Sequence, residues 1–240
     1  MGLTRSGCRG ILSALIITMA TEPAVRAADW PNYRGPDHNG VSKEAGWRTA
    51  WPAQGPKTLW KASLGPGFAS MAVCGGRVYA MGNVQDRDVV YCLDAVTGKE
   101  VWRQSYPCPL FAKMHEGGPC ATPTVQGGQV YVFSKNGDVL CMDANTGQVV
   151  WHKNLVKDLG LENLTWYFSG SPLIVDDLLI LNAGKSGVAL RKADGGLAWQ
   201  NGTDPGGYAS PVPYEAAGRK AAILFACREV FGVDAATGKV

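Results

Sequence analysis

The sequence of 240 residues has no long run of like charge and no low-complexity tract. Its formal net charge of +3 falls to +1 once the first 27 residues are set aside, which leaves 20 basic and 19 acidic side chains. A surface that binds nucleic acid needs a clear basic excess. The near balance of charge therefore argues against a nucleic-acid partner.

The motifs of several enzyme classes are also missing. The sequence has no nucleophile elbow, no Walker phosphate loop, no dinucleotide fingerprint and no cysteine and histidine at zinc-binding spacing. It has no Cys-x-x-Cys-His site for covalent haem either. The residues present therefore do not carry the hydrolase, nucleotide-binding, zinc or covalent haem chemistry that these motifs indicate.

No apolar run in the sequence is long enough to span a bilayer. The ten-residue run Ile11–Ala20 is too short, but it follows Arg5 and Arg9 and precedes small residues. This pattern predicts that residues 1–27 are a signal peptide and that the chain is exported, to the periplasm or the cell exterior. A disordered or interfacial terminus is the alternative. Cys8 precedes the apolar run, whereas a lipoprotein cysteine follows it.

One motif is written four times in the rest of the chain. Each copy has an apolar β-type run, a turn with glycine, and a second run that carries tryptophan in the first three copies. The turn glycines, which are 49, 48 and 43 residues apart, are Gly98, Gly147, Gly195 and Gly238. Such a period in short β-type segments is typical of a propeller. We predict an all-β fold with blades near residues 69–102, 120–151, 169–199 and 209–240.

The motif residues have predictable physical roles. An aspartate at the turn entrance accepts backbone N–H groups ahead of it, and glycine supplies the positive φ of the reversal. A tryptophan buries a large area and must pair its indole N–H, so we expect it to pack between neighbouring sheets. The turn aspartates are Asp94, Asp143 and Asp234, and the tryptophans are Trp102, Trp151 and Trp199. Arg191 replaces the aspartate in the third copy. We predict a less ordered turn there, with Asp194 supplying part of the missing acceptor.

Residues 28–56 precede the repeats. Their Pro and Gly density predicts an irregular strap, and we interpret Asp37-His38-Asn39 as a solvent-facing loop because no second cluster stands at metal-ligand spacing. The next segment, Lys57–Leu64, contains Trp60 without a preceding turn motif. Propellers often close their ring with an N-terminal strand, which removes exposed edges. We predict that Lys57–Leu64 is this closure strand.

The repeated Ala-x-Asp-x-x-Thr-Gly-x-x-x-Trp pattern resembles the tryptophan-docking motif of pyrroloquinoline-quinone-type (PQQ-type) propellers. That family includes quinoprotein alcohol dehydrogenases and the propeller lipoprotein of bacterial outer-membrane β-barrel assembly. Asp29–Ser42 resembles the N-terminal segment of exported PQQ-like repeat proteins of planctomycete type. Val240 stands two positions before the expected fourth tryptophan. The resemblance therefore implies that four blades are present from a longer ring of seven or eight.

Two connections that lead into inner strands carry candidate ligand residues. His115 and Glu116 lie in the first, and Trp166 and Tyr167 in the second are aromatic faces for a cofactor. In the second connection, Glu162 and Asn163 offer oxygen ligands of the kind that Ca²⁺ takes. In dehydrogenases of the family, the quinone stacks on Trp, and Glu with Asn holds Ca²⁺. The alternative is that both connections are ordinary loops whose aromatic residues pack on the blades. No catalytic residue is assigned.

Six cysteines follow the predicted signal peptide. Cys108 and Cys120 flank one long connection and are the best candidates for a disulfide in an oxidising compartment. Cys92 and Cys141 occupy the same repeat position, so we expect each to fill an inward strand site. Several quinoprotein dehydrogenases carry an adjacent cysteine pair beside the cofactor. The absence of such a pair weighs against the enzyme interpretation.

We therefore predict an exported PQQ-like propeller that acts as a binding or scaffold module. Its partner, a protein or a small molecule, would bind on the top face, where the connections enter the inner strands. One alternative is a dehydrogenase that uses pyrroloquinoline quinone with Ca²⁺. The other is an outer-membrane protein assembly factor. No transmembrane segment is expected in the mature chain.

Overall fold

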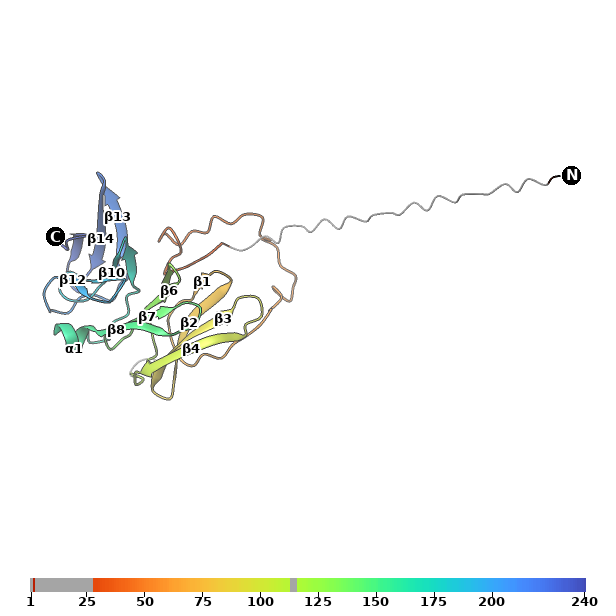
Figure 1. Cartoon of the computed structure of the whole chain (residues 1–240), viewed down its shortest axis with the longest axis horizontal. Helices are drawn as coiled ribbons and strands as arrows, with labels where there is room; N and C mark the ends of the chain where they lie inside the picture. The colour runs from red at the N-terminus through yellow and green to blue at the C-terminus, as the bar shows by residue number, and fades with distance from the viewer. Residues whose placement is uncertain (1, 3–27, 113–115) are drawn as a thin grey trace.

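The structure is a computed structural model that describes residue 2 and residues 28–112 and 116–240. Four antiparallel sheets follow one another in chain order, from yellow through green to blue (Figure 1). The prediction of an all-β propeller fold is confirmed, because the described residues form four antiparallel sheets and one helix of five residues, α1 (Leu155–Leu159). No helix in the described ranges is both long and apolar enough to cross a membrane. The predicted signal peptide lies outside the described residues.

Each sheet is one blade, and consecutive strands pair in it. The strands of the four blades are β1 (Ala72–Cys74), β2 (Arg77–Val84), β3 (Arg87–Asp94) and β4 (Glu100–Pro107); β5 (Thr124–Gln126), β6 (Gln129–Phe133), β7 (Asp138–Asp143) and β8 (Val149–Asn154); β9 (Leu173–Val175), β10 (Leu178–Leu181), β11 (Val188–Arg191) and β12 (Leu197–Gln200); and β13 (Val212–Ala216), β14 (Arg219–Phe225) and β15 (Val230–Asp234). The first strands of successive blades lie side by side, β1 with β5 and β9 with β13. These short strands are therefore the innermost ones.

The tryptophan of each of the first three blades docks on the turn of the next blade. Trp102 is buried, and its indole N–H donates to the Ala144 carbonyl at 2.9 Å. A Cβ on Gly147 would lie 2.6 Å from the Trp102 ring, so this glycine allows close approach as well as a positive φ of 73°. The same two contacts, with indole bonds of 2.7 to 3.0 Å, join Trp60 to Ala95 and Gly98, Trp151 to Lys192 and Gly195, and Trp199 to Ala235 and Gly238. The predicted packing of Trp102, Trp151 and Trp199 between blades is confirmed.

The turn aspartates accept the bonds expected of them. Asp143 Oδ1 accepts the backbone N–H groups of Asn145 and Thr146 and the Thr146 hydroxyl, all within 2.9 Å. These bonds lower the pKa of the Asp143 carboxyl from its usual value. Asp94 and Asp234 accept equivalent bonds from Thr97 and Thr237.

The third blade keeps the same turn without its aspartate. The Gly195 N–H donates to the Arg191 carbonyl at 2.9 Å, as the Gly147 N–H does to the Asp143 carbonyl at 2.8 Å. Asp194 Oδ1 accepts the Gly196 N–H at 2.8 Å, as the Thr146 hydroxyl accepts the Gln148 N–H in the second blade, so Asp194 takes the role of the threonine rather than that of the missing aspartate. The Arg191 side chain also pairs with Asp194 at 3.1 Å. That this turn is less ordered than its equivalents stays a prediction.

Two predictions about the first half of the chain differ from the structure. Cys108 and Cys120 are both free, so the predicted disulfide is wrong. Lys57–Leu64 forms no described strand, although Trp60 docks on blade one as the later tryptophans dock on theirs. Its pairing with a last blade therefore stays a prediction. Cys92 and Cys141 are fully buried, as expected for inward strand sites.

A buried polar cluster between blades one and two explains the free Cys108. The Lys135 ammonium lies 3.8 Å from Asp88 Oδ1 and donates to Cys108 Sγ at 3.3 Å. Asn136 Nδ2 also donates to this sulfur, at 3.4 Å, and Asn83 Nδ2 donates to Asp88 Oδ1 at 2.8 Å. Burial, reinforced by Asp88, raises the pKa of Cys108 to about 11, so the group is a thiol. Its sulfur is an acceptor within the blade interface.

Replacing a docking tryptophan should strongly destabilise the protein. Trp151→Ala removes a buried ring and its bond to Lys192, so the free energy of unfolding should fall by about 3–5 kcal/mol. Urea unfolding measures this loss. Trp51→Ala is the control, because Trp51 is exposed and should change stability by under about 0.5 kcal/mol. A near-zero loss for Trp151→Ala would contradict the docking role.

Two glycine variants separate backbone strain from ring contact. Gly127→Ala meets no atom within 4 Å, so only its positive φ of 60° should cost stability, by about 1–2 kcal/mol. Gly147→Ala carries a similar φ cost and also meets Trp102, so it should lose about 1–3 kcal/mol more. Equal losses in urea unfolding would show that the close approach of Trp102 is unimportant.

Removing the buried ammonium should leave Asp88 buried without its charge partner. Lys135→Met should therefore lower the free energy of unfolding by about 3–5 kcal/mol. Lys153→Met is the matched control, because the ion pair of Lys153 with Asp158 is partly exposed and should contribute under about 1 kcal/mol. Adding Asp88→Asn to Lys135→Met should recover part of the loss. A Lys135→Met variant as stable as the control would refute the role of this pair.

Candidate functional site

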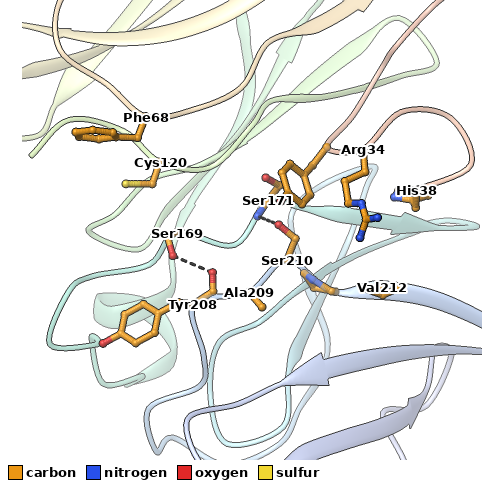
Figure 2. A pocket seen from close by; sticks show the side chains of 12 residues that line it. Arg34, His38, Phe68, Cys120, Ser169, Ser171, Tyr208, Ala209, Ser210 and Val212 are labelled. Atoms are coloured by element: carbon orange, nitrogen blue, oxygen red, sulfur yellow. Dashed lines mark hydrogen bonds between the residues drawn. The ribbon is translucent and has the colours of Figure 1, made fainter. Parts of the chain in front are cut away.

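A pocket of about 430 Å³ opens where the innermost strands begin (Figure 2). Its size is within the usual range of small-molecule sites. The last strand of each of the first three blades begins at the tryptophan-docked turn and ends at the other edge of the sheet. The innermost strand of the next blade begins at that other edge, so the pocket and the docked turns lie at opposite ends of the strands. The lining residues are Tyr33, Arg34, His38, Phe68, Cys120, Ser169, Ser171, Tyr208, Ala209, Ser210, Pro211 and Val212.

Hydroxyl groups link the blades along one wall of this pocket. The Thr122 N–H of blade two donates to Ser171 Oγ of blade three at 2.8 Å. The Ser171 N–H donates in turn to Ser210 Oγ of blade four at 2.9 Å, a bond drawn in Figure 2. A Cβ on Gly170 would lie 2.6 Å from the Ala209 carbonyl oxygen. Small residues are therefore required at this strand start.

The strap supplies the opposite wall. Trp30 exchanges two backbone hydrogen bonds with Val73 of β1, and the Val125 N–H of β5 donates to the Pro31 carbonyl at 2.7 Å. The strap is thus attached to the innermost strands of blades one and two. Beyond Trp30 it is irregular, as predicted. Its interpretation as a solvent-facing loop needs correction at His38, which is half-buried and lines the pocket.

The strap holds its pocket residues in a fixed and unusual backbone conformation. Arg34 and His38 have positive φ values of 65° and 53°, which non-glycine residues rarely adopt. A Cβ on Gly35 would lie 2.7 Å from the Trp30 ring, so the Trp30 ring packs directly on this glycine, as the docking tryptophans pack on the glycines of the blade turns. The Gly40 N–H donates to the Arg34 carbonyl at 2.8 Å. Backbone strain of this kind often accompanies ligand sites.

The pocket lining carries positive charge without a carboxylate. Arg34 is its one permanent charge, and none of the lining residues is Asp or Glu. Burial lowers the pKa of His38, which nearby Asp37 only partly opposes, so the imidazole is neutral at pH 7. Asp37 itself pairs with Lys43 at 2.6 Å. The electrostatic balance inside the pocket therefore favours an anion.

Neither of the predicted aromatic residues lines this pocket, but Trp166 contacts a residue that does. Trp166 is partly exposed, and its backbone N–H donates to the Tyr208 hydroxyl at 3.4 Å. Tyr167 contacts Phe111 edge-on, with ring centroids 4.4 Å apart. Phe111 of the first connection thus contacts Tyr167 of the second, a pairing that the sequence did not indicate.

The predicted oxygen ligands Glu162 and Asn163 are consecutive residues, and neither lines this pocket. Glu162 and Glu116 are exposed, and Asn163 Oδ1 accepts the Leu164 N–H at 3.0 Å within its own turn. Asn163 also lines a second cavity of about 580 Å³. His115 lies outside the described residues. Across residues 28–112 and 116–240, no three His, Cys, Asp or Glu side chains gather as metal ligands. The described part of the chain therefore does not fit a Ca²⁺-bound quinone.

The pocket residues of the strap were not proposed as site residues from the sequence. Tyr33 and Arg34 gave no motif, and His38 was considered only as a metal ligand. The available signal was the Pro and Gly density of the segment, which shows an irregular backbone but not its location. Hydrogen bonds between the strap and the innermost strands place Tyr33, Arg34 and His38 at the pocket.

Known proteins resemble this chain over much of its length. The quinohemoprotein alcohol dehydrogenase ADH IIB of Pseudomonas putida is 30% identical over 138 residues, which cover 52% of this chain and 19% of the relative. The outer membrane protein assembly factor BamB of Yersinia pestis is 26% identical over 153 residues, which cover 60% of this chain and 36% of the relative. The chain therefore spans between a fifth and somewhat over a third of the length of these relatives.

A solved structure supports the same fold. The quinohemoprotein alcohol dehydrogenase from Comamonas testosteroni matches with a TM-score of 0.60 and 15% identity, over 88% of this chain and 40% of that one. A family model described as outer membrane protein assembly factor BamB matches residues 45–210 and 112–240. The chain belongs to this family of PQQ-like propeller repeat proteins.

Proposed function

We propose that this protein is an exported binding module whose ligand enters the pocket between the strap and the innermost strands. The observation that supports the proposal is the composite wall: Arg34 and His38 come from the strap, and Ser171, Ser210 and Tyr208 come from two later segments. Residues far apart in the sequence converge on one cavity of ligand size. The periplasm or the cell exterior is the proposed location.

Two other functions come from the relatives. The names of the dehydrogenase relatives support a quinone-dependent alcohol dehydrogenase. In this alternative the cofactors would be pyrroloquinoline quinone and Ca²⁺, and their ligands would be Trp166, Tyr167, His115, Glu116, Glu162 and Asn163. Residues 28–112 and 116–240 contain no group of three His, Cys, Asp or Glu side chains that would support this alternative. The family description supports an assembly factor that binds a protein partner. The ligand-sized pocket, lined by residues of the strap and of two later segments, favours a small molecule.

A ligand screen against a blocked variant tests the proposal. Val212 is partly exposed at the pocket, so Val212→Trp should fill the cavity. Val230→Trp is the matched control, because Val230 is similarly exposed on β15 and is absent from the lining. Small molecules that raise the melting temperature of the wild type should also stabilise the control but not Val212→Trp.

The same screen separates the alternatives. Stabilisation by pyrroloquinoline quinone with Ca²⁺ that survives in Val212→Trp, together with quinone-dependent alcohol oxidation, would favour the dehydrogenase. Ligands that stabilise all three proteins equally would place binding outside the pocket and contradict the proposal.

A further inference from the structure

The pocket is rich in hydrogen-bond donors and poor in charged acceptors. Arg34 offers a guanidinium with five N–H groups, and the hydroxyls of Tyr33, Ser171 and Ser210 add O–H donors. No carboxylate lines the cavity. A ligand that satisfies these groups must bring acceptor oxygens.

Arg34 is available to a ligand because little else occupies it. Its Nη2 donates to the Asn39 carbonyl at 3.0 Å, and it forms no ion pair within the described residues. The nearest acidic residue in the strap sequence, Asp37, already pairs with Lys43 at 2.6 Å. A guanidinium that keeps most of its donors can bind a carboxylate or a phosphate with two parallel bonds.

The two serines point to the same chemistry. Each Oγ accepts a backbone N–H, from Thr122 at Ser171 and from Ser171 at Ser210. With that bond fixed, the hydroxyl hydrogen is left to donate elsewhere, and no acceptor for it occurs among the described residues. Ser171 is only 3% exposed, so its hydroxyl is a buried donor that lines the cavity without an acceptor. A buried donor without an acceptor is costly, and a ligand oxygen would relieve that cost.

We propose that the pocket binds the oxyanion group, a carboxylate or a phosphate, of a small organic ligand. This inference rests on the proposed function. Arg34 pairs with the oxyanion, and the hydroxyls of Ser171 and Ser210 donate to its oxygens. The apolar part of the ligand contacts Tyr208, Val212 and Phe68, which line the same cavity. A cationic ligand is disfavoured by Arg34, and a neutral one leaves the guanidinium without a charge partner.

Matched probes test this chemistry on the purified full chain. Benzoate and phenyl phosphate carry an oxyanion on a ring, and benzamide is the neutral counterpart of benzoate. Calorimetric titration should show that at least one anionic probe binds about tenfold more tightly than benzamide. The stronger of the two anions identifies whether carboxylate or phosphate is the preferred group.

Variants of one arginine locate the effect. Arg34→Gln should weaken binding of the anionic probe about tenfold and leave benzamide binding unchanged. The affinity of Arg34→Lys for the anionic probe should lie between those of the wild type and Arg34→Gln, because lysine keeps the charge and loses the two parallel hydrogen bonds. Arg48→Gln, at an exposed arginine outside the pocket, should bind as the wild type does. Melting temperatures of all variants should match, which shows that folding is intact.

The outcomes separate this inference from the proposed function. Equal binding of benzoate, phenyl phosphate and benzamide in the wild type, lost in Val212→Trp, would overturn the oxyanion inference and leave the pocket as a binding site. Anion binding that is unchanged in Arg34→Gln would overturn the inference as well. Anion binding that is unchanged in Val212→Trp would contradict both, as would no binding of any of the three probes.

Discussion

The structure depends on one repeated interaction, the docking of an indole on the turn of the next blade. The ring needs a flat, close surface, and its N–H needs an acceptor. The turn provides both, because glycine removes the Cβ beneath the ring and the residue after the turn entrance presents its carbonyl. The aspartate holds that turn in shape through its own bonds to the backbone. The docking interaction therefore needs Trp from one blade and both Gly and Asp from the next.

This division has a consequence for the opposite end of the strands. Docking fixes the outer strands of neighbouring blades at the turn end, while hydroxyl bonds between Thr122, Ser171 and Ser210 fix the strand starts at the other. Between blades one and two, the Lys135, Asp88 and Cys108 cluster adds a buried polar contact. The pocket wall is thus supported by rigid strands, which is the arrangement that a binding site requires.

The sequence predicted the parts of the fold that rest on local chemistry. Asp143, Thr146 and Gly147 form their turn with bonds to one another that span at most four residues, so their spacing was sufficient evidence. The tryptophan docking was predictable because the same residue recurs at the same offset. Cys108 was different, since its sulfur contacts Lys135 and Asn136 of the next blade, and no spacing within one connection shows that.

The candidate site was the least predictable part for the same reason. His38 contacts the pocket only because Trp30 and Pro31 attach the strap to β1 and β5, a long-range pairing without a sequence signature. The two connections that were predicted do reach this end of the molecule, where the described residues that line the pocket are their ends, Cys120 and Ser169.

The division between repeated and unrepeated sequence matches a division of roles. Docking residues recur because every pair of blades must solve the same packing problem, and a change in any of them costs stability. The strap occurs once, carries no blade-to-blade docking, and still supplies Arg34 and His38 to the pocket. Substitutions at Arg34 or His38 can therefore alter what the pocket accepts while the repeated docking residues stay unchanged. A fold whose framework is this constrained can change ligand most readily through an unrepeated segment such as the strap.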